Sequence, residues 1–169
     1  MIFEAQTEWI APDNFPDLRG YKIISIDLET KDPDLKAKGS GSIIGNGEVV
    51  GIAVAVDGWC KYYPIAHEGG GNLDKKKVIE WLKDVCATSS IKVFHNAMYD
   101  VCWLRSYGIK INGFIMDTMV MASLIDENRF RYDLNSISFD YTGERKSEAA
   151  LYEAAKDWGV DPKAELYKL

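Results

Sequence analysis

Histidine and cysteine, which build many metal and disulfide sites, are scarce in this sequence of 169 residues. There are two histidines and three cysteines, and Cys60, Cys86 and Cys102 show no close metal-binding spacing. An odd number of cysteines does not make a complete disulfide framework, so the simplest interpretation is a reduced, cytoplasmic protein.

Long apolar runs and an excess of positive charge are missing as well. The longest apolar run, residues 49–56, is too short to cross a bilayer, and residues 1–10 lack a signal-peptide pattern. We therefore expect no membrane partner. The net charge of −6 argues against broad capture of nucleic acid, although acidic side chains that hold metal ions reverse the local sign.

The composition is that of one folded domain. Hydrophobic residues make up 47% and charged residues 27%, which is typical of globular proteins. Residues 1–20 read as an irregular lead-in, because Pro12, Pro16 and Gly20 punctuate them. We expect the folded domain over residues 21–169.

Two carboxylates within the apolar segment 23–30 are the most informative feature. As a strand, this segment points Ile26 and Leu28 to one face and Asp27 and Glu29 to the other. Acids are depleted in strands and buried unpaired charges are costly, so a divalent cation held by oxygen ligands would offset this pair. A strand end whose acids face water is the alternative, and these residues alone do not decide.

The spacing along the rest of the chain predicts a mixed α/β fold. Residues 31–47 read as a flexible loop, and strands over 48–56 and 59–65 joined by Asp57-Gly58 complete an antiparallel three-strand meander. Helices are expected over 73–87, from His95-Asn96 to about 107, over 117–125 and in shorter pieces through 158, with short strands over 91–94 and 114–116. This order indicates a mixed sheet with helices on its faces.

A third acid follows the strand at 91–94. Asn96 and Asp100 are four residues apart, so on a helix they share one face. An acid in a first helical turn is also ordinary, because the helix dipole favours it there. If the strand at 91–94 lies beside the first strand, however, Asp100 reaches the same point as Asp27 and Glu29.

Four sequence segments, in the order in which they occur, match the motifs of a known family. They are Asp27-Leu28-Glu29-Thr30, Asn96-x-x-Tyr99-Asp100, Asp117-Thr118-Met119 and Arg131-Tyr-Asp133-Leu134-Asn-Ser136. Together they resemble the proofreading 3′–5′ exonuclease domain of family A DNA polymerases, in the DEDD group with a ribonuclease H-like fold. The resemblance covers most of the chain from about residue 21.

The resemblance implies a metal-dependent exonuclease that hydrolyses the terminal phosphodiester of single-stranded DNA with two Mg²⁺ or Mn²⁺ ions. Asp27 would bridge both ions, Glu29 would hold one beside the terminal 3′-hydroxyl, and Asp100 would hold the second through water. Two such ions can stabilise the attacking and the leaving oxygen together. Asp27, Glu29 and Asp100 are thus the expected catalytic and metal-binding residues.

The same resemblance places Leu28, Thr30, Asn96 and Tyr99 among the residues that bind the 3′-terminal nucleotide. For Tyr99 a packing role on its helix is an alternative, since tyrosine is amphipathic. Asp117 and Asp133 are expected to cap helices and to have no metal role.

One family motif, Tyr-x-x-x-Asp on a late helix, is not found. The nearest pair, Tyr152 and Asp157, has one residue too many, and the variant that uses histidine is unsupported by His67 or His95. We expect the domain to be incomplete at its C-terminus and the chain alone to be weak or inactive. A polymerase region or a C-terminal remainder of the exonuclease is the expected partner.

Two rival interpretations remain. An RNA-trimming exonuclease similar to ribonuclease D would share Asp27, Glu29 and Asp100. A non-catalytic module that binds nucleic acid or protein would hold at most one weak ion at these acids. The number of Mn²⁺ sites and the preference between RNA and DNA separate the three.

Overall fold

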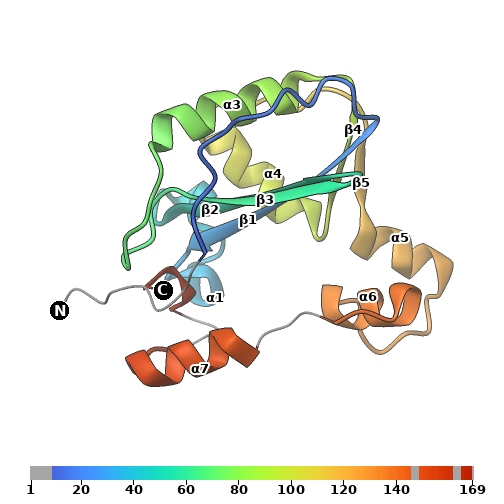
Figure 1. The fold of residues 1–169 in the computed structure, drawn as a ribbon. Helices are drawn as coiled ribbons and strands as arrows, with labels where there is room; N and C mark the ends of the chain where they lie inside the picture. Colours follow the sequence, from blue (N-terminus) through green and yellow to red (C-terminus); the bar gives the residue numbers. More distant parts are fainter. Residues whose placement is uncertain (1–8, 146–148, 162–164, 169) are drawn as a thin grey trace.

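A five-stranded sheet in the order β3-β2-β1-β4-β5 forms the centre of the computed structural model, which describes residues 9–145, 149–161 and 165–168. The strands are β1 (Ile23–Lys31), β2 (Glu48–Val56), β3 (Trp59–Pro64), β4 (Ile91–Phe94) and β5 (Ile115–Asp117). Strands β1, β2 and β3 pair antiparallel, whereas β4 pairs parallel with both β1 and β5. The predicted meander followed by parallel strands is therefore confirmed (Figure 1).

Helices lie on both sides of this sheet (Figure 1). On one side are α3 (Lys75–Ala87) and α4 (Ala97–Ser106), and toward the other are α5 (Thr118–Ile125), α6 (Leu134–Thr142) and α7 (Ala149–Trp158). A short 3-10 helix, η1 (Leu166–Lys168), follows α7. The Ala155 side chain of α7 is fully buried. No helix in the described ranges is both long and apolar enough to span a bilayer.

The segment after β1 is not simply a flexible loop, which corrects the prediction for residues 31–47. It contains two short helices, α1 (Leu35–Lys38) and α2 (Gly41–Ile44). Both carboxylate oxygens of Asp32 accept a hydrogen bond from the Gly41 amide, and Gly45 ends α2 in the left-handed conformation. Helices of about one turn leave no apolar periodicity in a sequence, so the pattern missed them.

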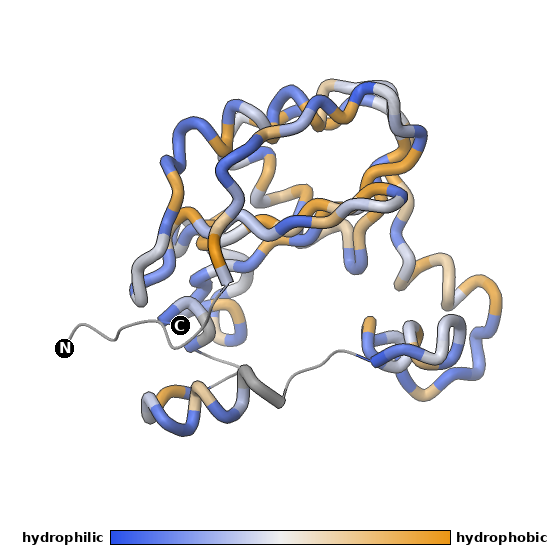
Figure 2. Tube along the Cα trace, viewed as in Figure 1, coloured by the Kyte–Doolittle hydropathy of each residue, from blue (hydrophilic) through white to orange (hydrophobic). Residues whose placement is uncertain are grey.

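The core lies between the sheet and α3 and α4. The alternation of β1 buries Ile24, Ile26 and Leu28, and β2 buries Val50, Ile52 and Val54. One face of α3 is buried in the same cluster through Val78, Leu82 and Val85. Apolar positions consequently follow the sheet and the helices that cover it (Figure 2). The other sheet face is left for polar and small side chains.

The described part of the lead-in, residues 9–20, has no helix or strand and packs on the core near α3. Phe15 stacks on Tyr63 with ring centroids 5.6 Å apart, and the Trp81 indole donates a 2.9 Å hydrogen bond to the Pro16 carbonyl. These contacts tie the lead-in to the side of the sheet opposite the carboxylates.

Candidate metal centre

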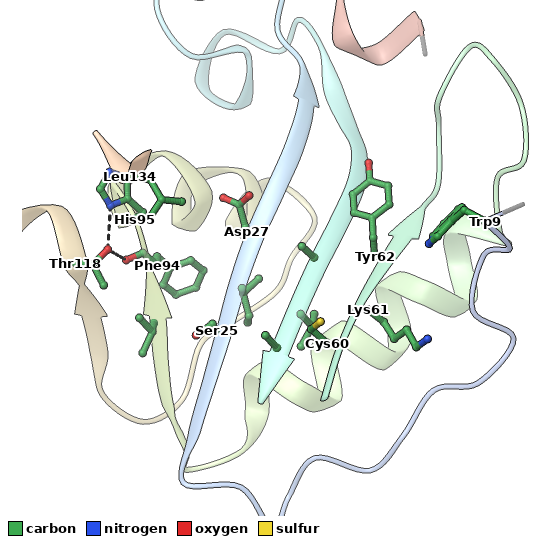
Figure 3. Close-up of a pocket in the computed structure, with 15 residues that line it drawn as sticks. Trp9, Ser25, Asp27, Cys60, Lys61, Tyr62, Phe94, His95, Thr118 and Leu134 are labelled. Carbon is green, nitrogen blue, oxygen red and sulfur yellow. Dashed lines mark hydrogen bonds between the residues drawn. The ribbon is translucent and has the colours of Figure 1, made fainter. Parts of the chain in front are cut away.

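A groove of about 540 Å³ runs over the sheet face that carries Asp27 (Figure 3). Its floor includes Ser25 of β1 and Ala53 and Ala55 of β2, because the alternation of both strands turns the large residues inward and the small ones outward. Asp27 and Tyr62 rise from the strands on either side of β2. Small side chains in the middle of the sheet therefore leave room in front of the acids.

Asp100 reaches this region because β4 is short. The pairing of β4 with β1 covers only Ile23–Ser25, and the chain then turns into α4. Further along β1, the Leu28 amide donates a 3.0 Å hydrogen bond to Asp100 Oδ1. The Asp100 side chain, from the first turn of α4, thus binds a main-chain amide of β1 that has no β4 partner. That amide belongs to Leu28, the residue between Asp27 and Glu29.

The three carboxylates are close enough to affect one another. Asp100 is only 4% exposed, and burial, together with the charge of Asp27 and more weakly that of Glu29, raises the pKa of Asp100 to about 7. The hydrogen bond from the Leu28 amide offsets part of this rise. The structure thus places near one another the three residues to which the resemblance assigns metal binding.

The three carboxylates are suitable ligands for a hard divalent cation, although they are not arranged as a complete coordination site. All three side chains offer carboxylate oxygens, which Mg²⁺ prefers, and a cation would offset the burial and the repulsion from Asp27 that raise the pKa of Asp100. Within the described ranges, however, no three histidine, cysteine, aspartate or glutamate side chains have the spacing of a metal-binding group. The residues suit the ion because they supply oxygen ligands and negative charge. One oxygen of Asp100 is already used by the Leu28 amide of β1.

Asn96 does not share a helical face with Asp100, which corrects that prediction. It precedes α4 with φ 64° and ψ 54°, a left-handed conformation, and its side chain is exposed. The strand-to-helix turn is held by Asp117, whose carboxylate accepts from the Asn96 amide at 3.0 Å and the Ala97 amide at 2.8 Å. An Asn tolerates this backbone better than most residues do.

The predicted capping roles are confirmed. Asp117 also accepts from the Met119 amide at 2.9 Å, so one carboxylate caps α5 and orders the start of α4. Asp133 accepts from the Ser136 amide at 3.0 Å at the start of α6. Both carboxylates are used by helix ends.

Tyr99 and Thr30 meet at the far end of β1. Their hydroxyls share a 2.6 Å hydrogen bond, and the Tyr99 hydroxyl donates to Asp32 Oδ2 at 3.0 Å. Because Asp32 also holds Gly41, this network links α4, β1 and α2. Sequence reasoning missed Asp32, which stands in a polar stretch without any distinguishing pattern.

The remaining predicted residues lie elsewhere. The Leu28 side chain is buried in the core on the opposite sheet face, so only its main chain faces Asp100. Tyr152 and Asp157, the nearest match to the missing motif, are both exposed on α7.

A mixed sheet in this order, with carboxylates from its first strand and from the helix after β4, defines an α/β nuclease of the ribonuclease H-like class. A model of the 3′–5′ exonuclease family matches residues 5–167. The chain belongs to this family of nucleic-acid hydrolases, which confirms the predicted fold and enzyme class.

Three known proteins illustrate the relationship. A DNA-directed DNA polymerase of Pseudomonas phage M6 is 35% identical over 96% of this chain and 26% of its own length. The chain thus spans about a quarter of this curated relative. Brucella melitensis NrnC with bound Mg²⁺ has a TM-score of 0.56 at 15% identity, covering 94% of this chain and 86% of that one. Escherichia coli RNase D has a TM-score of 0.54 at 15% identity, covering 89% and 36%. The two solved structures share the fold.

Proposed function

We propose that this chain hydrolyses the 3′-terminal phosphodiester of single-stranded DNA with Mg²⁺ or Mn²⁺, as the proofreading part of a DNA polymerase. The observation that carries the proposal is the proximity of three carboxylates: Asp27 lines the groove, and the charges of Asp27 and Glu29 act on Asp100, which the Leu28 amide holds between them. Family membership supports the reaction, and the phage polymerase relative supports DNA as the substrate.

The three acids would hold two ions. Asp27 would contact both, Glu29 one of them beside the terminal 3′-hydroxyl, and Asp100 the second through water. The ions supply positive charge that stabilises the attacking and leaving oxygens of the phosphodiester. Asp100 gives one oxygen to the Leu28 amide, and its second oxygen is the one proposed to face the water.

Residues around the acids would hold the terminal nucleotide. The exposed Asn96 side chain offers a donor and an acceptor at the turn before α4. The half-buried ring of Tyr99 and the hydroxyl of Thr30 lie beyond Glu29 and are fixed by their shared hydrogen bond. Leu28 would take part through its main chain, which also holds Asp100.

These 169 residues contain no Tyr-x-x-x-Asp, so they lack the family's fourth carboxylate and its water-orienting hydroxyl. We expect slow turnover by the chain alone. We propose that a polymerase region or a further exonuclease segment completes the site, because the phage relative is a polymerase that is much longer than this chain.

The test is release of the terminal nucleotide from a 3′-labelled single strand in Mn²⁺ under single-turnover conditions. Asp27→Ala should lower the rate at least about 100-fold, because a ligand shared by both ions is lost. Asp84→Ala, an exposed acid on α3, should leave the rate unchanged. Turnover that survives Asp27→Ala would show that the assigned site is wrong.

The same assay separates the rival interpretations. Faster cleavage of an RNA strand of identical sequence would favour an RNA-trimming enzyme over a proofreading domain. Calorimetric titration that finds one Mn²⁺ site or none, where the enzyme would hold two, would favour a non-catalytic binding module.

A further inference from the structure

Tyr62 of β3 stands in one row with the acids of β1. Asp27 pairs with Ala53 on β2, and Ala53 pairs with Tyr62 on β3, so the three side chains share one sheet face. Ala53, the residue between them on β2, has only a methyl side chain. Tyr62 also lines the groove that contains Asp27 (Figure 3).

Gly51 shows where the hydroxyl of Tyr62 lies. Gly51 is the direct partner of Glu29 across the β1–β2 pair. A Cβ atom added at Gly51 would lie 1.7 Å from the Tyr62 hydroxyl oxygen, so the phenol occupies the place of the missing side chain. Opposite Cβ positions in an antiparallel pair are about 5 Å apart, which places this hydroxyl beside Glu29.

His67 holds the hydroxyl from the other side. The Tyr62 hydroxyl oxygen and His67 Nε2 are 2.5 Å apart. The His67 main chain is itself clamped by Asn72, whose side chain accepts from the His67 amide and donates to its carbonyl, each at 2.7 Å. The imidazole is therefore a fixed partner of the phenol.

The tautomer of His67 decides which way the phenol donates. Its Nδ1 is buried and has no hydrogen-bond partner within the described ranges. If Tyr62 donated to Nε2, Nδ1 would be a buried N–H without an acceptor, and the lone pairs of the phenol would face two carboxylates. With the proton on Nε2, His67 donates to Tyr62 and the phenolic O–H is left to donate toward Glu29 and Asp27.

The charges of the site agree with a protonated phenol. Burial, and then the charges of Glu29 and Asp27, raise the pKa of Tyr62 above its usual value. Burial lowers the pKa of His67, which favours the neutral imidazole. Tyr62 thus stays a hydrogen-bond donor beside the two acids.

We propose that Tyr62, held by His67, is a positioning residue that donates a hydrogen bond to the Glu29 carboxylate or to a water bound between them, and so orients Glu29 toward the metal ion. This role rests on the proposed function, because it needs Asp27 and Glu29 to be metal ligands. Hydrogen-bonded partners of metal ligands commonly change metal affinity by about 10- to 100-fold.

Two neighbouring tyrosines provide a matched test. Tyr62→Phe should weaken Mn²⁺ binding in calorimetric titration about 10-fold. Tyr63→Phe removes a hydroxyl that bonds to the Asn14 carbonyl on the other side of the sheet, and it should leave Mn²⁺ affinity unchanged. Equal affinities of the two variants would overturn the role of Tyr62.

The imidazoles give a second measurement that does not depend on turnover. The chain has two histidines, so long-range ¹H–¹⁵N spectra resolve His67 once His67→Gln has assigned it. We expect the proton on Nε2 and a shift of the His67 signals on addition of Mg²⁺ that Tyr62→Phe abolishes. A proton on Nδ1, or signals that ignore Mg²⁺, would contradict the proposal.

Two further variants separate the proposal from its premise. His67→Gln keeps an amide donor and should retain most Mn²⁺ affinity, whereas His67→Leu should lose as much as Tyr62→Phe. If Asp27→Ala binds Mn²⁺ like the wild type, the metal site itself is wrong. If Asp27→Ala loses Mn²⁺ while Tyr62→Phe and Tyr63→Phe stay equal, only the role of Tyr62 fails.

Discussion

Two charged side chains are buried near β4, and their surroundings differ in kind. Lys92 is fully buried and Asp100 is 4% exposed. The Lys92 ammonium donates to four oxygens at 2.5–3.0 Å: the Thr88 carbonyl and hydroxyl and the carbonyls of Ser90 and Asn112. Although burial lowers the pKa of Lys92, every donor direction of its ammonium has an acceptor.

Asp100 is less well compensated. Burial, and then the charges of Asp27 and Glu29, work against its ionised form, and the main-chain hydrogen bond from Leu28 offsets only part of this. Lys92 joins the end of α3 to β4, and the surrounding oxygens satisfy its hydrogen bonds, whereas Asp100 is held among like charges. A buried charged group whose hydrogen bonds are complete indicates a role in stabilising the fold. A buried charged group placed among like charges indicates a site for a cation.

The largest effect on stability is expected at Lys92. Lys92→Met keeps the length of the side chain but leaves three carbonyls and a hydroxyl without their donor, which should lower the free energy of unfolding by about 3 kcal/mol. Urea unfolding measures this change. Lys83→Met, an exposed lysine on α3, should shift stability by less than about 0.5 kcal/mol. A Lys92→Met protein as stable as the control would contradict the structural role.

Asp100→Asn should raise stability, by about 2 kcal/mol at pH 8 without metal. The folded state binds the Asp100 proton more tightly than the unfolded state, so between about pH 4 and 7 the wild type loses stability as pH rises. The asparagine variant lacks this loss and still accepts from the Leu28 amide. Urea unfolding at pH 4, 6 and 8 follows the growing difference.

Asp100→Ala is the matched control, because it removes the charge and the acceptor together. The Leu28 amide then loses its partner, so this variant should be about 1–3 kcal/mol less stable than Asp100→Asn. A pH-independent difference between wild type and Asp100→Asn would show that the folded state does not raise the pKa of Asp100.

The acids proposed to bind metal are easier to predict from the sequence than the buried lysine that supports the fold. Asp27 and Glu29 interrupt an apolar strand with a period of two, and Asp100 stands in a motif that the resemblance covers. Lys92 lies in a strand of four residues, and its partners are three carbonyls and a hydroxyl of loops that carry no sequence signal.

Contacts across strands explain what else was missed. The position of Tyr62 depends on the register of β2 against both neighbours and on the absence of a side chain at Gly51, neither of which is visible in one sequence. Asn96 was placed on a helix because its spacing to Asp100 fits one, but Asp117 holds the preceding turn left-handed. Periodicity predicts elements, whereas side chains from distant segments set their ends.

The smallest expected effect is the gain in the free energy of unfolding on addition of Mg²⁺, which should differ between variants of Lys92 and variants of the acids. At a Mg²⁺ concentration ten times the dissociation constant, binding to the folded state alone adds about 1.4 kcal/mol to the free energy of unfolding. Lys92→Met should keep this increment on a lowered baseline, whereas Asp27→Ala and Asp100→Asn should reduce it. NaCl at matched ionic strength controls for screening of surface charge. An increment that Asp27→Ala retains in full would place the bound Mg²⁺ away from these acids, whereas one that only Lys92→Met removes would make Lys92 part of the responsive site.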